Sequence, residues 1–90
     1  MIPKEQLELF RDALLRSLKA GRSIGLNLES LALALTVAGF KRFTREELED
    51  EIQYFADAGF IAEVLKSHSL GHKIWRITKE GVDDLERRGY

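Results

Sequence analysis

The side chains that could do chemistry in this chain form one carboxylate-rich stretch and one pair of histidines. Six carboxylates lie between residues 46 and 57, and such a cluster can attract a divalent cation. The stretch lacks, however, the Asp-x-Asp-x-Asp-Gly loop of a calcium site. His68 and His72 lie in a predicted loop rather than on one face of a helix, so they are not held together as metal ligands. We therefore predict no metal site.

A catalytic site is not indicated either. The chain has no Cys, and its two His lie in one loop, which leaves no framework for a Ser-His-Asp or Cys-His set. The sequence GRSIGLN at residues 21–27 contains two glycines but not the terminal Gly-Lys-Ser/Thr of a phosphate-binding loop. We predict that the protein is not an enzyme and that it needs no cofactor.

The composition is that of a small soluble protein. Ninety residues, 44% of them hydrophobic and 32% charged, suit a single globular domain over residues 1–90. The absence of Cys excludes disulfides and thiolate metal sites, and it fits a reducing cytoplasm. No apolar run reaches the roughly 18 residues of a membrane span, and the polar start at residues 4–6 does not resemble a signal peptide. We expect a cytoplasmic protein with no membrane partner.

The charge is small overall but unevenly distributed. Fourteen Lys and Arg against fifteen Asp and Glu give a net charge of 14 − 15 = −1. Residues 1–45 hold eight basic and four acidic side chains, a net of +4, whereas residues 46–90 hold six and eleven, a net of −5. The chain as a whole therefore does not attract nucleic acid or an anionic membrane, and a polyanion would have to bind a local patch.

The best-marked element is a helix that begins after Thr44. Thr44 and Glu47 have the spacing of a capping box, and Gly59 supplies the left-handed residue that ends a helix. The side predicted to face the core carries Leu48, Ile52, Phe55 and Ala56. The polar side carries Glu46, Glu49, Asp50, Gln53 and Asp57. Over residues 45–58 one positive charge stands against six carboxylates, so this helix has a net charge of 1 − 6 = −5.

Two helices precede it. The first is predicted over Lys4–Ala20, with Pro3 suiting its start and Gly21 its end. Its main apolar stripe is Leu7, Phe10, Leu14 and Leu18, with a weaker stripe of Leu9, Ala13 and Ala20 beside it. Residues 21–27 are expected to be extended, and a short third strand there is an open alternative. Asn27 caps the second helix, which is predicted to run to about Ala38 before Gly39.

The second helix is apolar nearly all round. Its core side is predicted to be Leu28, Leu31, Ala32 and Leu35. Leu33 and Val37 then lie on the far side, where a monomer would expose them unless the first helix or another subunit covers them. We expect a homodimer formed by the first two helices. The predicted interface is Leu9, Ala13, Leu33 and Val37.

The remaining elements are a turn, a hairpin and a last helix. Phe40 and Phe43 are expected to anchor the turn between the second and third helices, with the two cations between them pointing outward. Strands are predicted over Phe60–Leu65 and His72–Thr78, with Trp75 and Ile77 on the core face. Thr78 then caps a short helix that turns Val82 and Leu85 inward and ends at Gly89.

This order resembles that of a winged helix-turn-helix domain: an α+β fold with a three-helix core, a two- or three-stranded antiparallel wing and a short C-terminal helix. The apolar spacing of the third helix, running into Gly59-Phe60-Ile61, is similar to the end of a winged-helix recognition helix. Trp75-Arg76-Ile77-Thr78 with Gly81 resembles the run that closes the hairpin in MarR-like, ArsR-like and PadR-like regulators. More narrowly, residues 43–61 and 75–86 resemble small winged-helix proteins of Mu-like prophages.

The resemblance implies a DNA-binding regulator of transcription that contacts DNA through the third helix and the wing. The candidate contacts are Lys41, Arg42 and Arg45 around the turn, and Lys66, His68, Lys73 and Arg76 on the hairpin. Each of these alone could be an ordinary surface charge. Because the third helix is acidic, we expect the wing and the turn to dominate any contact with double-stranded DNA. The alternative is a protein-interaction or dimerisation module that does not bind DNA.

Overall fold

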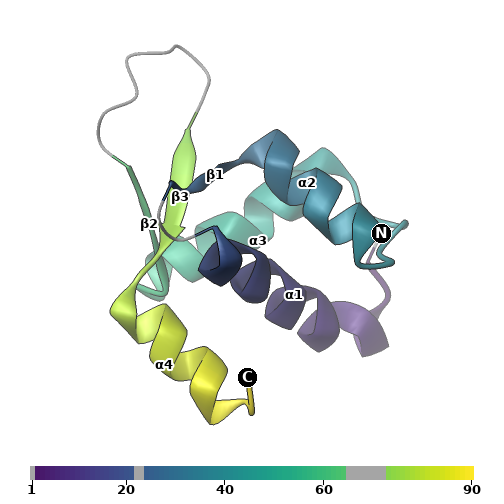
Figure 1. The fold of residues 1–90 in the computed structure, drawn as a ribbon. Coiled ribbons are helices and arrows are strands. Elements are labelled where there is room, and N and C mark those ends of the chain that lie inside the picture. Colours follow the sequence, from purple (N-terminus) through teal and green to yellow (C-terminus); the bar gives the residue numbers. More distant parts are fainter. Residues whose placement is uncertain (1, 22–23, 65–72) are drawn as a thin grey trace.

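The computed structural model describes residues 2–21, 24–64 and 73–90 (Figure 1). Its elements are η1 (Lys4–Gln6), α1 (Leu7–Ala20), β1 (Leu26–Asn27), α2 (Leu28–Val37), α3 (Arg45–Asp57), β2 (Ile61–Glu63), β3 (Ile74–Ile77) and α4 (Lys79–Arg87). Helix α1 contacts α2 and α4, and α3 lies behind it (Figure 1). This order confirms the predicted one. In the described part of the chain, no helix is both long and apolar enough to cross a membrane.

Helix α1 starts later than predicted. Residues 4–6 form a turn of 3₁₀-helix in which the amide of Gln6 donates to the carbonyl of Pro3 over 2.9 Å. The predicted stripe is largely confirmed, because Phe10, Leu14 and Leu18 are fully buried. Leu7 is only half-buried, and Leu15, which the stripe did not include, is fully buried. The buried side of α1 is wider than one stripe because α1 packs against α2, α4 and β3.

The sheet has the optional third strand. Its antiparallel order is β1-β3-β2, with Leu26 opposite Trp75 and Ile61 opposite Ile77. Trp75 and Ile77 pack against the core, as predicted. Both strands of the hairpin are shorter than predicted within the described residues. Leu65 and His72, which the prediction placed in them, lie outside those residues.

Thr78 and Gly81 hold α4 against the start of β2. The Thr78 hydroxyl donates to the carbonyl of Gly59 over 2.6 Å, and it accepts a hydrogen bond from the amide of Gly81 over 3.1 Å. Gly81 is buried, and a Cβ placed there would stand 2.2 Å from the carbonyl oxygen of Phe60. The Thr-x-x-Gly spacing therefore has two physical causes, a helix cap and a close approach of two backbones.

One core lies among the helices and the inner face of the sheet. Its fully or almost fully buried side chains are Phe10, Leu14, Leu15, Leu18, Leu31, Leu35, Leu48, Ile52, Phe55, Ile61 and Leu85. Every helix from α1 to α4 contributes at least one of them. Arg88 adds a polar connection between the two ends of the chain, because it contacts Asp12 over 2.6 Å and Asp84 over 2.7 Å.

The predicted capping box of α3 is present and does more than cap. The Glu47 amide donates to the Thr44 hydroxyl over 3.1 Å, and the Glu47 carboxylate accepts from the Thr44 amide over 3.0 Å. The second oxygen of the same carboxylate accepts from the amide of Ile2 over 2.9 Å. Glu47 thus connects the start of α3 to the N-terminal segment. The hydrogen bonds from the amides of Ile2 and Thr44 lower the pKa of Glu47 to about 2.

The lowered pKa of Glu47 makes the stability of the fold depend on pH. A carboxyl group whose pKa is lower in the folded state stabilises the fold above its unfolded pKa, and this contribution is lost as pH falls toward the folded value. We therefore expect the free energy of unfolding of the natural chain to fall between about pH 4.5 and pH 2. In Glu47→Gln this part of the pH dependence is expected to disappear. Urea unfolding at a series of pH values measures both.

The matched control for this experiment is Glu46→Gln, which removes the neighbouring exposed carboxylate. Its pH dependence is expected to follow that of the natural chain. An identical loss of stability below pH 4.5 in Glu47→Gln and in the natural chain would contradict the role given to Glu47.

Candidate nucleic-acid interface

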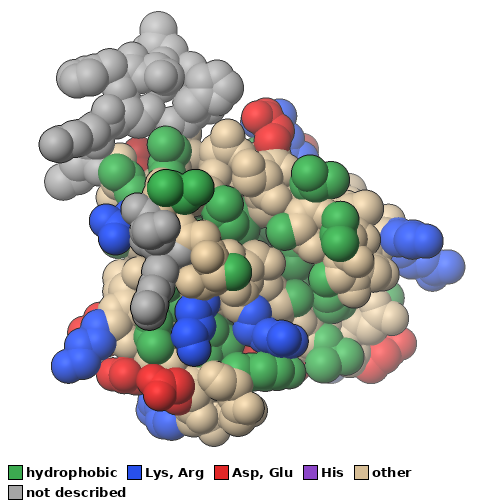
Figure 2. All heavy atoms as spheres, viewed as in Figure 1, with side chains coloured by type: hydrophobic (Ala, Val, Ile, Leu, Met, Phe, Trp, Pro, Cys, Tyr) green, Lys and Arg blue, Asp and Glu red, His purple; other side chains and the backbone are tan. Residues whose placement is uncertain are grey.

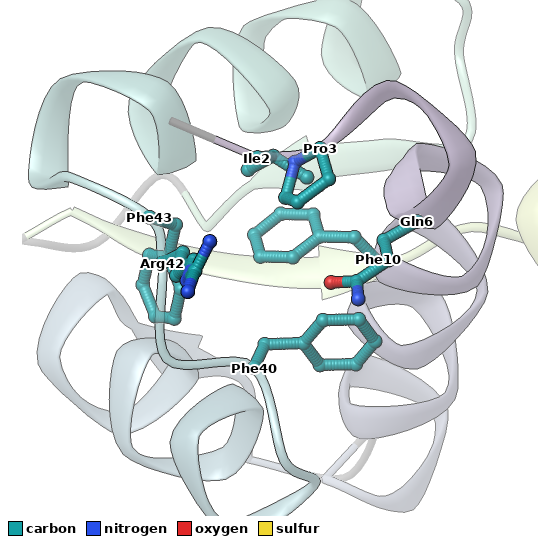
Figure 3. Close-up of a pocket in the computed structure, with 7 residues that line it drawn as sticks. All are labelled: Ile2, Pro3, Gln6, Phe10, Phe40, Arg42 and Phe43. Carbon is teal, nitrogen blue, oxygen red and sulfur yellow. The ribbon is translucent and has the colours of Figure 1, made fainter.

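The turn between α2 and α3 is held by aromatic packing. Gly39, with a φ of +107°, turns the chain away from α2. The rings of Phe40 and Phe43 then contact the ring of Phe10 edge-on, with centroids 5.4 and 5.3 Å away. Figure 3 shows the three rings meeting from α1 and from the turn. Both Phe residues are half-buried against the core, as the sequence predicted.

This packing leaves the cations of the turn in water. Lys41 and Arg42 stand between the two anchored Phe residues, and both are exposed. Arg45, the first residue of α3, is exposed as well and lies 3.9 Å from Glu49. An exposed ion pair at that separation contributes little energy, so the positive charge of Arg45 remains available to a binding partner. The three cations predicted around the turn are therefore accessible together.

A small hollow lies beside the turn (Figure 3). Its lining residues are Ile2, Pro3, Gln6, Phe10, Phe40, Arg42 and Phe43. It has room for about one water molecule, so it does not accommodate an effector in this conformation. We read it as a packing defect where the N-terminal segment crosses the aromatic cluster.

Helix α3 divides its six carboxylates between two sides. Glu47 and Glu51 are half-buried on the side toward the rest of the fold, and Glu51 accepts from Arg11 over 2.6 Å. This hydrogen bond raises the pKa of Arg11 above its usual value. The Arg11 guanidinium also lies 4.3 Å from the centroid of the Tyr54 ring. Arg11 therefore neutralises one acid of α3 and links α3 to α1.

The outer side of α3 remains acidic. Its exposed carboxylates are Glu46, Glu49, Asp50 and Asp57. With Arg45 the outer side has a net charge of 1 − 4 = −3, compared with −5 for the whole helix. These four carboxylates are the acids predicted for the polar side, so that prediction is confirmed, and Arg11 offsets one acid on the other side of α3.

Two of the four cations predicted on the wing are among the described residues. Lys73 and Arg76 are exposed, and Arg76 lies on β3 between the core-facing Trp75 and Ile77. Lys66 and His68 fall outside the described residues. The turn with Lys41 and Arg42 precedes α3, and the sheet with Arg76 follows it (Figure 1). The 13-residue helix between the turn and the sheet is about 20 Å long.

The four residues predicted for a dimer interface differ in exposure. Leu9, Leu33 and Val37 are 57%, 65% and 79% exposed. Ala13 is half-buried and packs against the core. Figure 2 shows hydrophobic side chains on the face over α2 and α1, with α3 behind these helices.

Metal chemistry gains no support from the described side chains. Within residues 2–21, 24–64 and 73–90, no three or more His, Asp or Glu side chains come together as a possible metal site. His68 and His72 lie outside these ranges.

The sequence did not reveal Arg11 as part of this region. Arg11 and Glu51 are 40 residues apart, and neither belongs to a motif that indicates the pairing. In the sequence, Arg11 is simply a cation within the first helix, which was predicted from its apolar stripe.

Comparison with known proteins places the fold. No protein-family model matches the chain, and no curated protein does. Among solved structures, a PadR-like transcriptional regulator from Bacillus cereus matches with a TM-score of 0.77 and 20% identity, over 94% of this chain and 82% of that one. The PcaV transcriptional regulator from Streptomyces coelicolor, in complex with its natural ligand, matches with a TM-score of 0.68 and 20% identity, over 88% and 50%.

A third structure is that of an S. aureus MepR mutant bound to an oligodeoxyribonucleotide. It matches with a TM-score of 0.72 and 20% identity, over 91% of this chain and 56% of that one. These likenesses confirm the predicted α+β fold, a winged helix-turn-helix with a three-stranded sheet. The chain spans only about half the length of PcaV and MepR. None of the three is described as a prophage protein, so the narrower resemblance stays a prediction.

The two ion pairs of α3 should differ in energy. The side chains of Arg11 and Glu51 are 20% and 14% exposed, whereas those of Arg45 and Glu49 are 69% and 56% exposed. We expect a double-mutant cycle to give a coupling of about 1–2 kcal/mol for Arg11 with Glu51. For Arg45 with Glu49 we expect about 0.3–0.5 kcal/mol. Urea unfolding of the Ala variants of each pair measures the two values under one condition. Equal coupling energies for the two pairs would contradict the conclusion that the acids of α3 toward α1 are paired and those on its outer side are solvated.

Proposed function

We propose that this winged helix-turn-helix domain binds double-stranded DNA and regulates transcription. The observation that supports the proposal most directly is the likeness to regulators of transcription, together with the likeness to a MepR structure that contains an oligodeoxyribonucleotide. The proposed protein is a cytoplasmic DNA-associated regulator rather than an enzyme, with no cofactor and no membrane partner. The alternative from the sequence, a docking module that does not bind DNA, would be preferred only if DNA binding failed.

The proposed contacts come from the two ends of α3. The candidate residues are Lys41, Arg42 and Arg45 at the turn, and Lys66, His68, Lys73 and Arg76 at the wing. Helix α3, which separates the turn from the sheet, is about 20 Å long and exceeds the roughly 12 Å width of the major groove. The two groups can therefore contact phosphates on both sides of the groove while α3 lies across it. In this arrangement most of the affinity comes from the phosphate backbone.

The acids between these groups limit how deeply α3 enters the groove. A carboxylate about 10 Å from a phosphate raises the energy by roughly 0.4 kcal/mol in water, and by more in a drier groove. Four exposed carboxylates on the outer side would therefore weaken binding substantially if α3 lay among the bases. We propose that the outer side of α3 stays in solvent and that its carboxylates prevent α3 from entering the groove deeply. A carboxylate close to the groove can still accept a hydrogen bond from cytosine.

The first prediction from this model concerns a cation of the turn. Lys41→Gln is expected to weaken binding to a labelled duplex several-fold and to reduce the slope of log affinity against log salt by about 1. Fluorescence anisotropy at a series of salt concentrations measures both quantities. The control is Arg87→Gln on α4, which removes the same charge from a site outside the proposed interface. Equal losses in the two variants, or no binding of the natural chain at low salt, would refute the proposed contact surface.

The second prediction concerns the acids of α3. Removing Glu46 or Asp50 as Glu46→Gln or Asp50→Asn should raise the affinity about twofold, from the roughly 0.4 kcal/mol of one such repulsion. The same anisotropy titration measures the change. A gain of tenfold or more would mean that these carboxylates lie among the phosphates. A loss would mean that they contact DNA directly.

A further inference from the structure

The outer face of α2 is unlike that of any other helix in this fold. Helices α1, α3 and α4 each carry several charged side chains, whereas α2 (Leu28–Val37) contains one, Glu29. The side of α2 away from the core presents Leu33 and Val37, which are among the most exposed large apolar side chains described. A helix that is apolar on all sides is normally covered on all sides. Among the described residues, those that cover α2 lie on its core side, where Leu31 and Leu35 are fully buried.

The polar groups at the two ends of this face complement each other. Exposed Glu29 lies in the first turn of α2, and exposed Lys41 lies in the turn that follows the helix. Leu33 is close to the middle of the ten-residue helix. A second α2 packed antiparallel across Leu33 would place residue n opposite residue 66 − n of the other copy. Glu29 would then face Val37 of the second copy, at the end of α2 that leads into the turn with that copy's Lys41.

We propose that this face binds a second copy of the chain, with the two α2 helices antiparallel and Leu33 at the two-fold axis. Leu33 and Val37 of both copies form the apolar centre, and Glu29 of each copy pairs with Lys41 of the other. Antiparallel packing also opposes the two helix dipoles favourably. Leu9 on α1 is a further exposed apolar side chain.

The geometry predicts a weak dimer. Helix α2 is about 15 Å long, so the contact is smaller than the roughly 800 Å² per partner of a standard interface. We therefore expect dissociation in the micromolar range or above. The apolar centre of the contact lies on α2, whereas Lys41 is also a proposed DNA contact. Dimerisation is therefore measured without DNA, so that its outcome does not depend on the proposed function.

Sedimentation velocity from roughly 10 µM to 1 mM tests the proposal. The natural chain is expected to dimerise, and Leu33→Gln is expected to raise the dissociation constant about tenfold or more. Gln53→Ala, an exposed change on α3, should leave it unchanged. Glu29→Lys and Lys41→Glu should each weaken the dimer, and their combination should restore it. A monomer throughout this range, or a dimer indifferent to Leu33→Gln, would overturn the proposal. Failure of the charge swap to restore dimerisation would overturn the antiparallel register.

Cross-linking provides a test that does not rely on weakening the protein. The chain contains no Cys, so Leu33→Cys introduces a single thiol at the proposed two-fold axis. Packed helices lie 8–10 Å apart, which brings facing Cβ atoms within reach of a disulfide. Mild oxidation should cross-link Leu33→Cys at least tenfold faster than Gln53→Cys. Equal rates in the two variants would overturn the proposed axis.

Discussion

Burial of one side of α3 is the constraint on which the rest of the structure depends. Leu48, Ile52 and Phe55 are all buried, and because each helical residue is rotated by about 100° from the last, these three fix the direction of every other side chain of the helix. Glu47 and Glu51 fall beside the buried stripe and find partners in the N-terminal segment and in α1. The remaining carboxylates of α3 face solvent. The acidity of its outer side is therefore set by core packing.

The same constraint positions the two basic groups. At the start of α3, the Thr44 cap and the two turn Phe residues fix the path of the chain around Lys41 and Arg42. At its end, Gly59 leads the chain directly into β2, and the hydroxyl of Thr78 holds the carbonyl of that glycine. Both ends of α3 are thus attached to the core. The length of α3 separates the turn from the start of the sheet, and the proposed contact with DNA depends on that separation.

Much of this fold could be predicted because its signals are local. Asn27, Thr44 and Thr78 each cap a helix within three residues, and glycines of positive φ end α2, α3 and α4 where expected. Such features depend on neighbouring residues and not on the tertiary arrangement. The apolar spacing of α3 likewise identified its buried side. The exposure of Leu33 and Val37 was also predicted, because the core side of α2 was already occupied.

Pairings between distant segments could not be predicted in this way. Glu47 with Ile2, Glu51 with Arg11 and Asp12 with Arg88 join residues 45, 40 and 76 positions apart. Of these three pairings, the one between Glu51 and Arg11 offsets a charge of α3 that the sequence count left unpaired. The burial of Leu15 was missed for a similar reason, because it depends on how many elements surround α1. Lys66 and His68 stay predictions, since they lie outside the described residues.

In the proposed arrangement, DNA contacts the two ends of α3 and not its outer side. Titration of the isotope-labelled chain with a short duplex, followed through backbone amide chemical shifts, tests it most directly. We expect the largest changes in residues 39–45 and 64–76, with small changes at Glu49, Gln53 and Asp57. If the largest changes instead ran along the outer side of α3, that helix would lie in the groove and the account would be contradicted.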